Sequence, residues 1–548
     1  MKTSAPRANL PLTWYSPDLR RRLSLCLSYV ASMLDADRQG EPFFGADRDA
    51  DGFATAHHAL EIGIPHVTGR ALDIIHGIEH ITGEAIDPIV EDIYASYLYS
   101  CCDLEDFLPV YFDPKREEKP YVEFHNVREC LEALVWRVRV RGDERAARVA
   151  SGMMDTLLAL TNPQTRSLDA GSLAGLSPEK AEKFERIGIP LTMTQGRLVG
   201  PLVLYYNQTA DQRALTLAGW YAEETLERCF EDTGLLRDAA HNHVHSITCT
   251  LSGILSYAML TGREDMMQKV ERIVTVGLRD AMSSYGYCKE QLWLESEQGE
   301  SNQVGDLIQI FLMLASRGRQ AQWYHRAECA LRGGIFPAQV VDVDFMGNHP
   351  APATDAQRNM ADRAVGGFGF PNPTCLMCTP CQPVNTIDIT QGAAQAMCEC
   401  TRHIMTREGE HLRLNLWLSW DTPAAEVVSS LPLEGNITLR MKQGGLLSLR
   451  IPRRIEEGSW RVTVNEKPRE AVVAQGYAFL GRVEPGDVVQ AAFLPRWETQ
   501  AEFIYHKRYE VTWFGEQAVK VEPVEGFRPL FGDFPAAGAA NGGSHAES

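Results

Sequence analysis

Three cysteines at two-residue spacing are the densest group of potential metal ligands in the sequence. Cys375, Cys378 and Cys381 form a Cys-x-x-Cys-x-x-Cys motif, and Cys398 and Cys400 follow shortly downstream. Cys-x-x-Cys spacing suits zinc because the intervening turn aims both thiolates at one point. The motif is consistent with a catalytic zinc site, with a structural zinc that fixes a loop, or with unbound thiols.

Four carboxylates precede one of the apolar helical stretches. They are Glu290, Glu295, Glu297 and Glu300. Two carboxylates flanking a sugar bond suffice for glycoside hydrolysis, one as acid and the other as base or nucleophile. The alternative interpretation is a solvated acidic run, which requires no function.

Five helical hairpins place polar residues at equivalent points. Each hairpin is an apolar helical stretch, a short Gly- or Asp-marked turn and a second amphipathic stretch. The first helix of each hairpin starts with an unusual polar group, and in chain order these groups are His66, His125, Gln195 with Arg197, His245 and Glu300. If the hairpins close into a ring, these residues line one end of its central cavity.

Imidazoles and a guanidinium at that cavity suit a sugar ligand. His125, His243 and His245 can donate or accept hydrogen bonds with sugar hydroxyls, although a single buried histidine is more commonly structural. Arg197, if it faces the cavity, favours a substrate that carries a carboxylate; a surface arginine is the alternative.

The order of elements predicts a mixed, mainly α fold: an (α/α) helical-hairpin barrel followed by an antiparallel β-sandwich. Residues 1–53 are expected to form an N-terminal helix and an irregular lead-in, and residues 54–406 the barrel. The barrel contains a long loop at 340–391, rich in Pro, Gly and Cys, expected to cover the cavity mouth. One last barrel helix is expected from about Gly392 to Met405. Alternating residues after 407 then indicate a sandwich to residue 535. The Ala/Gly/Ser-rich segment 536–548 is expected to be a disordered tail.

Composition narrows the class of protein. The chain has 548 residues and a formal net charge of −19, which argues against nucleic acid or an anionic membrane as the main partner. Thirteen cysteines, mostly scattered through predicted helices, indicate reduced thiols. With no recognisable signal peptide or spanning segment, we expect a cytoplasmic protein; its oligomeric state is open, and a homodimer is compatible.

Several segments, in order, resemble the glycoside hydrolase family 127 group, whose founding activity is β-L-arabinofuranosidase. The resemblance covers roughly residues 55 to 465 and is consistent with the hairpin architecture. It rests on the helix starts at Phe124–Ala133 and His243–Ser246, on Glu300-Ser301-Asn302, on Trp323–Glu328, on Gly392–Met397, and on Leu431–Leu439 and Leu449–Pro452 at the sandwich.

The resemblance also carries departures from the family pattern. The family holds zinc with a Glu, the Cys two residues later and a downstream Cys-Cys pair that supplies the nucleophile. Here Glu300 is retained, Asn302 replaces the first Cys, and Asp388 and Ile389 stand at the paired positions. The family's acid/base position corresponds to the neighbourhood of Glu290, with Glu295 or Glu297 as alternatives.

Two versions of the site follow from these departures. In one, the loop restores zinc with Glu300, Cys375, Cys378 and Cys381 as ligands and Cys381 as nucleophile. In the other, Asp388 is the nucleophile and no metal is needed, because a carboxylate is already ionised at neutral pH whereas a thiol needs activation.

The resemblance implies a glycoside hydrolase that removes a terminal furanose-type or similar small sugar from an oligosaccharide. A catalytically silent carbohydrate-binding or scaffold barrel is one alternative. An epimerase-type α/α barrel, with paired histidines as acid and base, is another.

Overall fold

The computed structural model describes residues 17–58, 63–111, 121–122, 124–169, 190–293, 297–318, 320–532 and 534. The expectations for Glu295, for the 536–548 tail and for the first 16 residues of the lead-in lie outside these ranges, and those for the barrel and the sandwich lie partly outside them.

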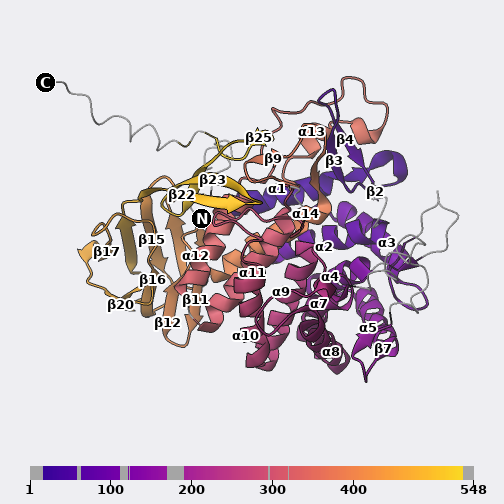
Figure 1. The fold of residues 1–548 in the computed structure, drawn as a ribbon, viewed down its shortest axis with the longest axis horizontal. Helices are drawn as coiled ribbons and strands as arrows, with labels where there is room; N and C mark the ends of the chain where they lie inside the picture. Colours follow the sequence, from indigo (N-terminus) through magenta and orange to yellow (C-terminus); the bar gives the residue numbers. More distant parts are fainter. Residues whose placement is uncertain are drawn as a thin grey trace.

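Six inner helices form a closed ring. Each contacts the next along the chain, and the last contacts the first. They are α2 (Gly63–Thr82), α4 (Phe124–Arg141), α7 (Gln195–Thr209), α9 (Val244–Thr261), α11 (Ser301–Gly318) and α14 (Ile387–His403). The predicted α/α barrel is therefore confirmed: the five hairpins that the sequence indicated and the further helix expected near Gly392–Met405 supply its inner helices (Figure 1).

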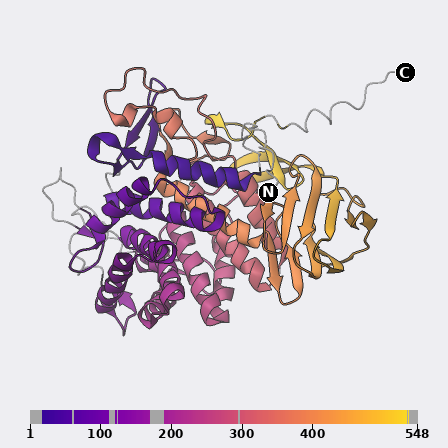
Figure 2. The same cartoon turned by 180° about the vertical axis from the view of Figure 1, so that it is seen from behind.

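Five outer helices follow their inner partners directly in the chain. These are α3 (Pro88–Cys102), α5 (Glu144–Ala159), α8 (Gln212–Cys229), α10 (Glu264–Arg272) and α12 (Ala321–Ala330). The sixth, α1 (Leu19–Ser32), comes from the other end of the chain and packs on α14 and α2. Figure 2 shows this indigo helix along the back of the barrel. Arg22, fully buried, fixes α1 by donating to the Phe336 carbonyl at 2.9 Å.

The turns between inner and outer helices explain why all inner helices run the same way. Gly142 ends α4 with φ +63° and Gly262 ends α9 with φ +70°, a conformation that glycine adopts without a Cβ penalty. Asp143 then caps α5, accepting hydrogen bonds from the backbone N–H groups of Arg145 and Ala146. Repeated turns of this kind leave the inner-helix N-termini together at one end, which we call the mouth.

The 340–391 segment contains more regular structure than expected. Helix α14 begins at Ile387, five residues before the predicted Gly392, because Thr386 caps it by accepting from the Ile389 N–H at 3.1 Å. The segment also contains η6 (Asp355–Gln357), α13 (Met360–Arg363), β9 (Cys375–Met377) and β10 (Pro383–Thr386). Elements of three or four residues are too short to show a period in the sequence.

The sandwich lies to one side of the barrel (Figure 1). One sheet has the order β11 (Met405–Glu408), β12 (His411–Leu414), β16 (Gly445–Arg450), β20 (Tyr477–Val483) and β19 (Val472–Ala474). The other has the order β13 (Trp420–Asp421), β14 (Ala425–Ser429), β15 (Gly435–Met441), β21 (Val488–Phe493), β17 (Arg461–Val464) and β18 (Lys467–Pro468). All pairs are antiparallel except β12 with β16. The buried Trp417 packs edge-on against Phe493 between them.

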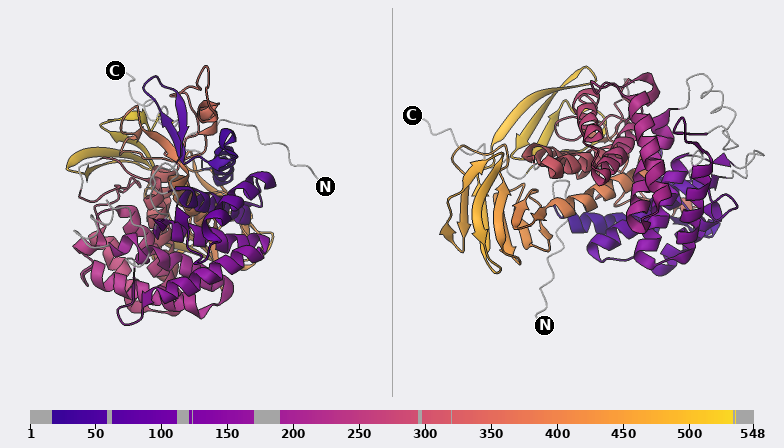
Figure 3. Two further views of the ribbon diagram at one scale, coloured as in Figure 1. Left: turned by 90° about the vertical axis from the view of Figure 1, so that its right-hand side faces the viewer. Right: turned by 90° about the horizontal axis from the view of Figure 1, so that it is seen from below.

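A third sheet joins the sandwich to the barrel. It consists of β22 (Trp497–Ile504), β23 (Lys507–Phe514) and β24 (Gln517–Glu522). Its Trp513 belongs to a buried cluster with Tyr285 and Cys329 of the barrel. Figure 3 shows these yellow strands lying over the barrel helices. The sequence predicted one sandwich up to residue 535 and did not indicate this separate sheet.

Short elements complete the described chain. β3 (Gly45–Arg48) pairs with β4 (Ala54–His57) and with β10, and β9 pairs with β25 (Phe527–Pro529). The remaining pairs are β1 (Leu34–Asp35) with β2 (Glu41–Pro42), β5 (Val110–Tyr111) with β6 (Tyr121–Val122), and β7 (Thr161–Asn162) with β8 (Ser167–Leu168). The short helical turns are η1 (Ala36–Arg38), η2 (Leu191–Met193), η3 (Asp238–Ala240), η4 (Ile273–Gly277) and η5 (Leu331–Ile335). None of the helices in the described ranges combines the length and apolar character needed to cross a bilayer.

Candidate active site

Close packing of α11 on α14 sets two acidic residues at neighbouring helix starts. A Cβ on Gly305 would lie 2.3 Å from the Gly392 carbonyl oxygen, and one on Gly392 would lie 2.6 Å from the Asn302 Cα. Only glycine permits this approach. Glu300 directly precedes α11 and Asp388 lies in the first turn of α14, so both lie at the mouth.

Asp388 is held by two basic side chains from α2. Its Oδ1 lies 3.1 Å from His66 Nε2 and 3.1 Å from Arg70 Nη2. Burial alone would raise the pKa of the Asp388 carboxyl, but Arg70 and then His66 outweigh it and hold the pKa well below its usual range. The side chain keeps 19% of its surface exposed, so an ionised carboxylate faces the mouth.

Arg70 organises the layer beneath Asp388, and the sequence analysis missed it. Its Nε lies 2.9 Å from Glu129 Oε2, and its Nη1 donates to Gln391 of α14. Its Nη2 also contacts His245 Nε2 at 3.2 Å. One guanidinium thus ties α2 to α4, α9 and α14. A charged residue inside an apolar helix was the available signal, but its i,i+3 spacing from Asp73 is also that of an ordinary surface ion pair.

His245 is a positioned, neutral imidazole. Burial lowers its pKa even though Asp306 acts in the opposite direction. Its Nδ1 donates to Asp306 Oδ2 at 2.8 Å, which leaves Nε2 to accept from Arg70. The side chain is 3% exposed, so His245, which was predicted to bind sugar hydroxyls, lies within the hydrogen-bond network around Arg70.

A second acidic group gathers around the start of α9. His243, Glu290 and Glu300 each present a ligand atom within 4.8 Å of the others. His243 Nε2 lies 3.5 Å from Glu300 Oε1, and the buried Glu300 Oε2 has no hydrogen-bond partner within the described ranges. Burial, reinforced by the charge of Glu300, raises the pKa of Glu290. Glu290 therefore keeps its proton to a higher pH than an ordinary glutamate does.

The other predicted mouth residues have distinct environments. His125 is partly exposed, and its ring centroid lies 6.4 Å from that of His66. Gln195 Oε1 accepts from the Leu168 N–H at 2.9 Å, which uses this side chain structurally. Arg197, 1% exposed, lines a separate cavity deeper in the barrel. Glu297 forms an ion pair with Lys507 of β23.

The predicted thiolate site is not assembled in the described residues. Cys375 is buried in β9, Cys378 is half-buried and Cys381 is exposed. They form no three-ligand group with one another or with Glu300. Burial raises the pKa of Cys378 to about 11, with Glu297 adding to the shift, so this thiol stays protonated at neutral pH.

The zinc implied by the family resemblance fits these residues only in a changed form. Asn302, at the position of the family's first Cys, uses its Oδ1 to accept from the Gln303 N–H at 2.8 Å. His243, Glu290 and Glu300 offer one imidazole and two carboxylates, a donor set that Zn²⁺ also accepts. The partnerless Glu300 Oε2 is compatible with a cation there.

Two other His- and Glu-containing groups contain a competing arginine. Glu91, beside His76 and Glu79, lies 2.7 Å from Arg141. The other group, His325, Cys329 and Glu516, has Arg450 at 3.5 Å from Glu516. A guanidinium already neutralises each carboxylate, which makes a cation less favourable there.

Comparison with known proteins places the fold. No family model matches the sequence, and no curated protein matches it. Among solved structures, a GH127 β-L-arabinofuranosidase from Geobacillus stearothermophilus T6 aligns over 91% of this chain and 80% of its own, with 14% identity and a TM-score of 0.56. Another GH127 β-arabinofuranosidase aligns over 92% of this chain and 83% of its own, with 13% identity and a TM-score of 0.58.

A third structure, described as a glycoside hydrolase, covers 88% of this chain and 84% of its own, at 14% identity and a TM-score of 0.53. These similarities extend over barrel and sandwich together, as the sequence resemblance predicted. The chain therefore has the six-hairpin barrel and sandwich fold of the GH127 β-L-arabinofuranosidases.

Proposed function

We propose that the mouth of the barrel hydrolyses a glycosidic bond, with Glu290 as general acid and Asp388 as nucleophile or general base. The observation that supports this most directly is the opposite surroundings of two carboxyl groups at one end of the barrel: Glu290 lies in a group with Glu300, whereas Asp388 Oδ1 lies 3.1 Å from both His66 and Arg70. Glu290 is shifted upward by burial and Glu300, and Asp388 downward by Arg70 and His66. Such a divided pair is the usual arrangement for acid and base roles.

The chemistry follows from these protonation states. Glu290 donates its proton to the leaving oxygen as the glycosidic bond breaks. Asp388 attacks the anomeric carbon, or removes a proton from an attacking water. Arg70 and His66 keep Asp388 ionised, and we propose that His125 and His243 bind sugar hydroxyls.

Neighbouring segments pack around the stretch that leads from Glu290 into α11. The Gly299 N–H donates to the Pro371 carbonyl at 2.7 Å, which lays the 340–391 segment against the start of α11. The β22–β23 hairpin reaches the same strip, since Lys507 pairs with Glu297 and Glu502 binds Ser284. This enclosure, with the fold likeness, supports a small terminal sugar of furanose type, released from an oligosaccharide, as the substrate.

The test is a panel of aryl glycosides that includes β-L-arabinofuranoside. Asp388→Asn and Glu290→Gln are each expected to lower kcat/KM by about 10²- to 10⁴-fold, while Glu297→Gln serves as the matched acidic control and stays near wild type. No turnover of any glycoside by the wild-type protein would favour a silent carbohydrate binder. Loss in His245→Ala without loss in Asp388→Asn would favour an epimerase-type mechanism.

A second candidate is hydrolysis assisted by a divalent cation bound by His243, Glu290 and Glu300. The gathering of these three residues favours it. A bound cation would act as a Lewis acid at the sugar oxygens. Elemental analysis of the purified protein decides between the two: a stoichiometric metal that is lost in His243→Ala, together with inhibition by chelators, would establish this candidate and remove Glu290 as the acid.

A further inference from the structure

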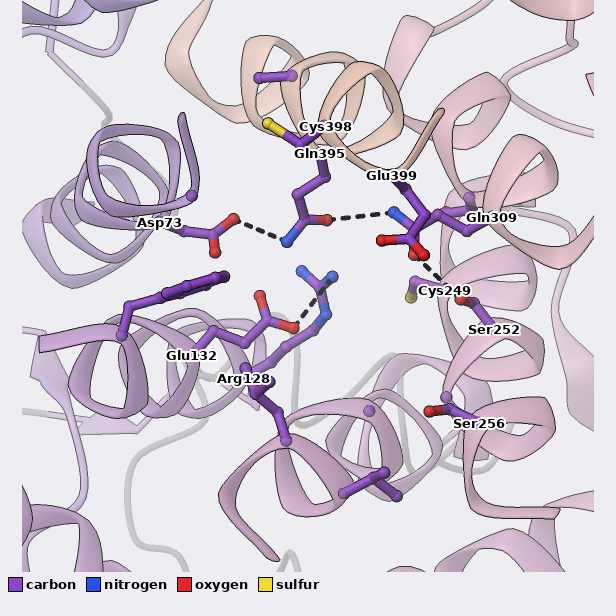
Figure 4. A pocket seen from close by; sticks show the side chains of 18 of the residues that line it. Asp73, Arg128, Glu132, Cys249, Ser252, Ser256, Gln309, Gln395, Cys398 and Glu399 are labelled. Atoms are coloured by element: carbon purple, nitrogen blue, oxygen red, sulfur yellow. Dashed lines mark hydrogen bonds and ion pairs between the residues drawn. The ribbon is translucent and has the colours of Figure 1, made fainter. Parts of the chain in front are cut away.

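A second cavity opens at the far end of the barrel from the mouth. Its volume is about 280 Å³, close to the lower end of the roughly 300–1,000 Å³ typical of small-molecule pockets. All six inner helices line it, mainly through their middle and last turns, as seen close up in Figure 4. At the rim, Asn207 and Arg402 are exposed to solvent, so the cavity is accessible.

The Arg70 layer separates this cavity from the mouth. Arg70 joins Glu129, Gln391 and His245 across the barrel, and none of these four residues lines the second cavity. Asp306 faces the cavity from the other side of the same network. The two ends are therefore distinct binding environments.

Most charges in this cavity are matched by protein partners. Asp73 accepts from Gln395 at 2.7 Å and also from Gln391. Arg128 pairs with Glu129 at 2.7 Å and with Glu132 at 3.5 Å. Figure 4 shows Asp73 turned to Gln395, and Arg128 to Glu132.

Arg197 is the exception. It lines the cavity and is 1% exposed, yet among the residues that the structure describes its Nε and Nη1 have no hydrogen-bond partner. Glu132, 7% exposed, also lines the cavity with a partnerless Oε2. Leaving a buried charge unpaired is costly, so such groups indicate a missing partner.

The chemistry of the partner follows from these groups. The charge of Glu129 reaches Arg197, but the Nε and Nη1 donors of Arg197 stay unused within the described residues, and a ligand carboxylate suits them in charge and in hydrogen-bond geometry. Burial, with Glu129 and Asp73, raises the pKa of Glu132 to about 8, which makes it a proton-bearing donor at neutral pH. Ser252, Ser256 and Gln309 add hydroxyl and amide groups that suit hydroxyls.

We propose that the cavity at the C-terminal ends of the inner helices is a second ligand site, which binds a small hydroxylated monocarboxylate such as a sugar acid through Arg197. This site is independent of the proposed glycosidase chemistry at the mouth. Its occupant neutralises Arg197, places hydroxyls against the serines, and contacts no residue of the Arg70 layer.

Titration calorimetry of the full chain with D-glucuronate tests the proposal, with D-glucose as the uncharged counterpart. We expect saturable binding of glucuronate and at least about tenfold weaker binding of glucose, since charged hydrogen bonds contribute roughly 1.5–3 kcal/mol. Arg197→Gln is expected to weaken glucuronate binding at least about tenfold. Ser256→Trp, which fills the cavity from its wall, is expected to abolish it, and thermal melts establish that both variants fold.

Asp388→Asn, at the mouth, is the matched control and is expected to bind glucuronate as the wild type does. Loss of binding in Asp388→Asn with retention in Arg197→Gln would place the ligand at the mouth and overturn the proposal. Absence of saturable binding at millimolar glucuronate would overturn it too. Binding is measured directly, so a failure of the glycosidase proposal leaves this test readable.

Discussion

Two buried networks in this molecule contain the same residue types, but their carboxylate oxygens differ in how many hydrogen-bond partners they have. At the junction of barrel and sandwich, Glu328 binds Arg332 at 2.9 Å through Oε1, and its Oε2 accepts from Arg450 and from the Trp417 N–H. Glu516 likewise has a partner on each oxygen. At the mouth, Glu300 Oε2 has no partner in the described part of the chain, and Asp388 is partly exposed.

The difference separates structural from functional burial. A fully partnered carboxylate has its desolvation offset within the protein, so it contributes to the position of the elements that it joins. A carboxylate with an unused oxygen keeps capacity for a ligand. A candidate site in this chain is therefore marked by a buried polar atom whose hydrogen-bonding capacity is unused, more than by the charge or the type of the residue.

The largest expected effect comes from breaking the junction network. Glu328→Gln leaves Arg332 and Arg450 buried without their anion, so we expect a loss of roughly 3–5 kcal/mol in the free energy of unfolding. Glu300→Gln at the mouth is expected to change it by less than about 1 kcal/mol. Chemical denaturation of both variants measures this, and equal losses would contradict the distinction between the networks.

The pH dependence of stability sharpens the same comparison. Burial alone would lower the pKa of His325, but Cys329 and Glu516 outweigh it and raise the pKa to about 10. A raised histidine pKa stabilises the fold fully below the unfolded value near 6.5, and this stabilisation disappears as the pH rises toward 10. The denaturation midpoint should fall between those values, and His325→Gln should flatten the fall. A wild-type midpoint that is constant over this range would contradict the assignment.

At the mouth, pH should act on rate. Asp388 must be ionised and Glu290 protonated, so kcat/KM should be bell-shaped, with an acid limb below the usual carboxyl range and an alkaline limb above it. Glu300→Gln removes the negative charge that helps to raise the Glu290 pKa, so the alkaline limb should move to lower pH. An alkaline limb that stays in place in this variant would show that Glu290 is not the group that titrates.

The smallest effect is expected at the cysteine motif. Cys381 is exposed and outside any three-ligand group among the described residues, so Cys381→Ser should leave stability within about 0.5 kcal/mol and activity near wild type. Assays and elemental analysis of this variant check the prediction. Loss of both metal and activity would instead revive the thiolate mechanism.

The sequence predicted the barrel well because inner-helix starts carry local signals. Counting back from the family's Gly-Ala helix identified Asp388, and the repeated turns located His66, His245 and Glu300. It could not reveal Arg70, whose role depends on partners in three other helices. Such long-range contacts have no local pattern.

The cysteine motif has a clear local pattern, but its predicted convergence is not seen for the three cysteines, all of which the structure describes. Its spacing suggested convergence, but Cys375 lies in an extended strand that pairs with β25, so the turn that would aim Cys375 and Cys378 together is absent. Arg197 was expected at the mouth from its helix-start position. The hairpin repeat could not indicate which end of the barrel its long side chain would reach.

The position of helix α1 has a consequence for folding during synthesis. Its buried face rests on α14, and Arg22 donates to Phe336, 314 residues further along the chain. During synthesis at roughly 5–20 residues per second, α1 leaves the ribosome tens of seconds before the helix it must cover. Throughout that interval the apolar face of α1 cannot pack on α14, and the ring of inner helices stays open. The nascent chain thus exposes the apolar face of α1, which is prone to aggregate. A chaperone that shields this helix would determine how much of the protein reaches the closed barrel.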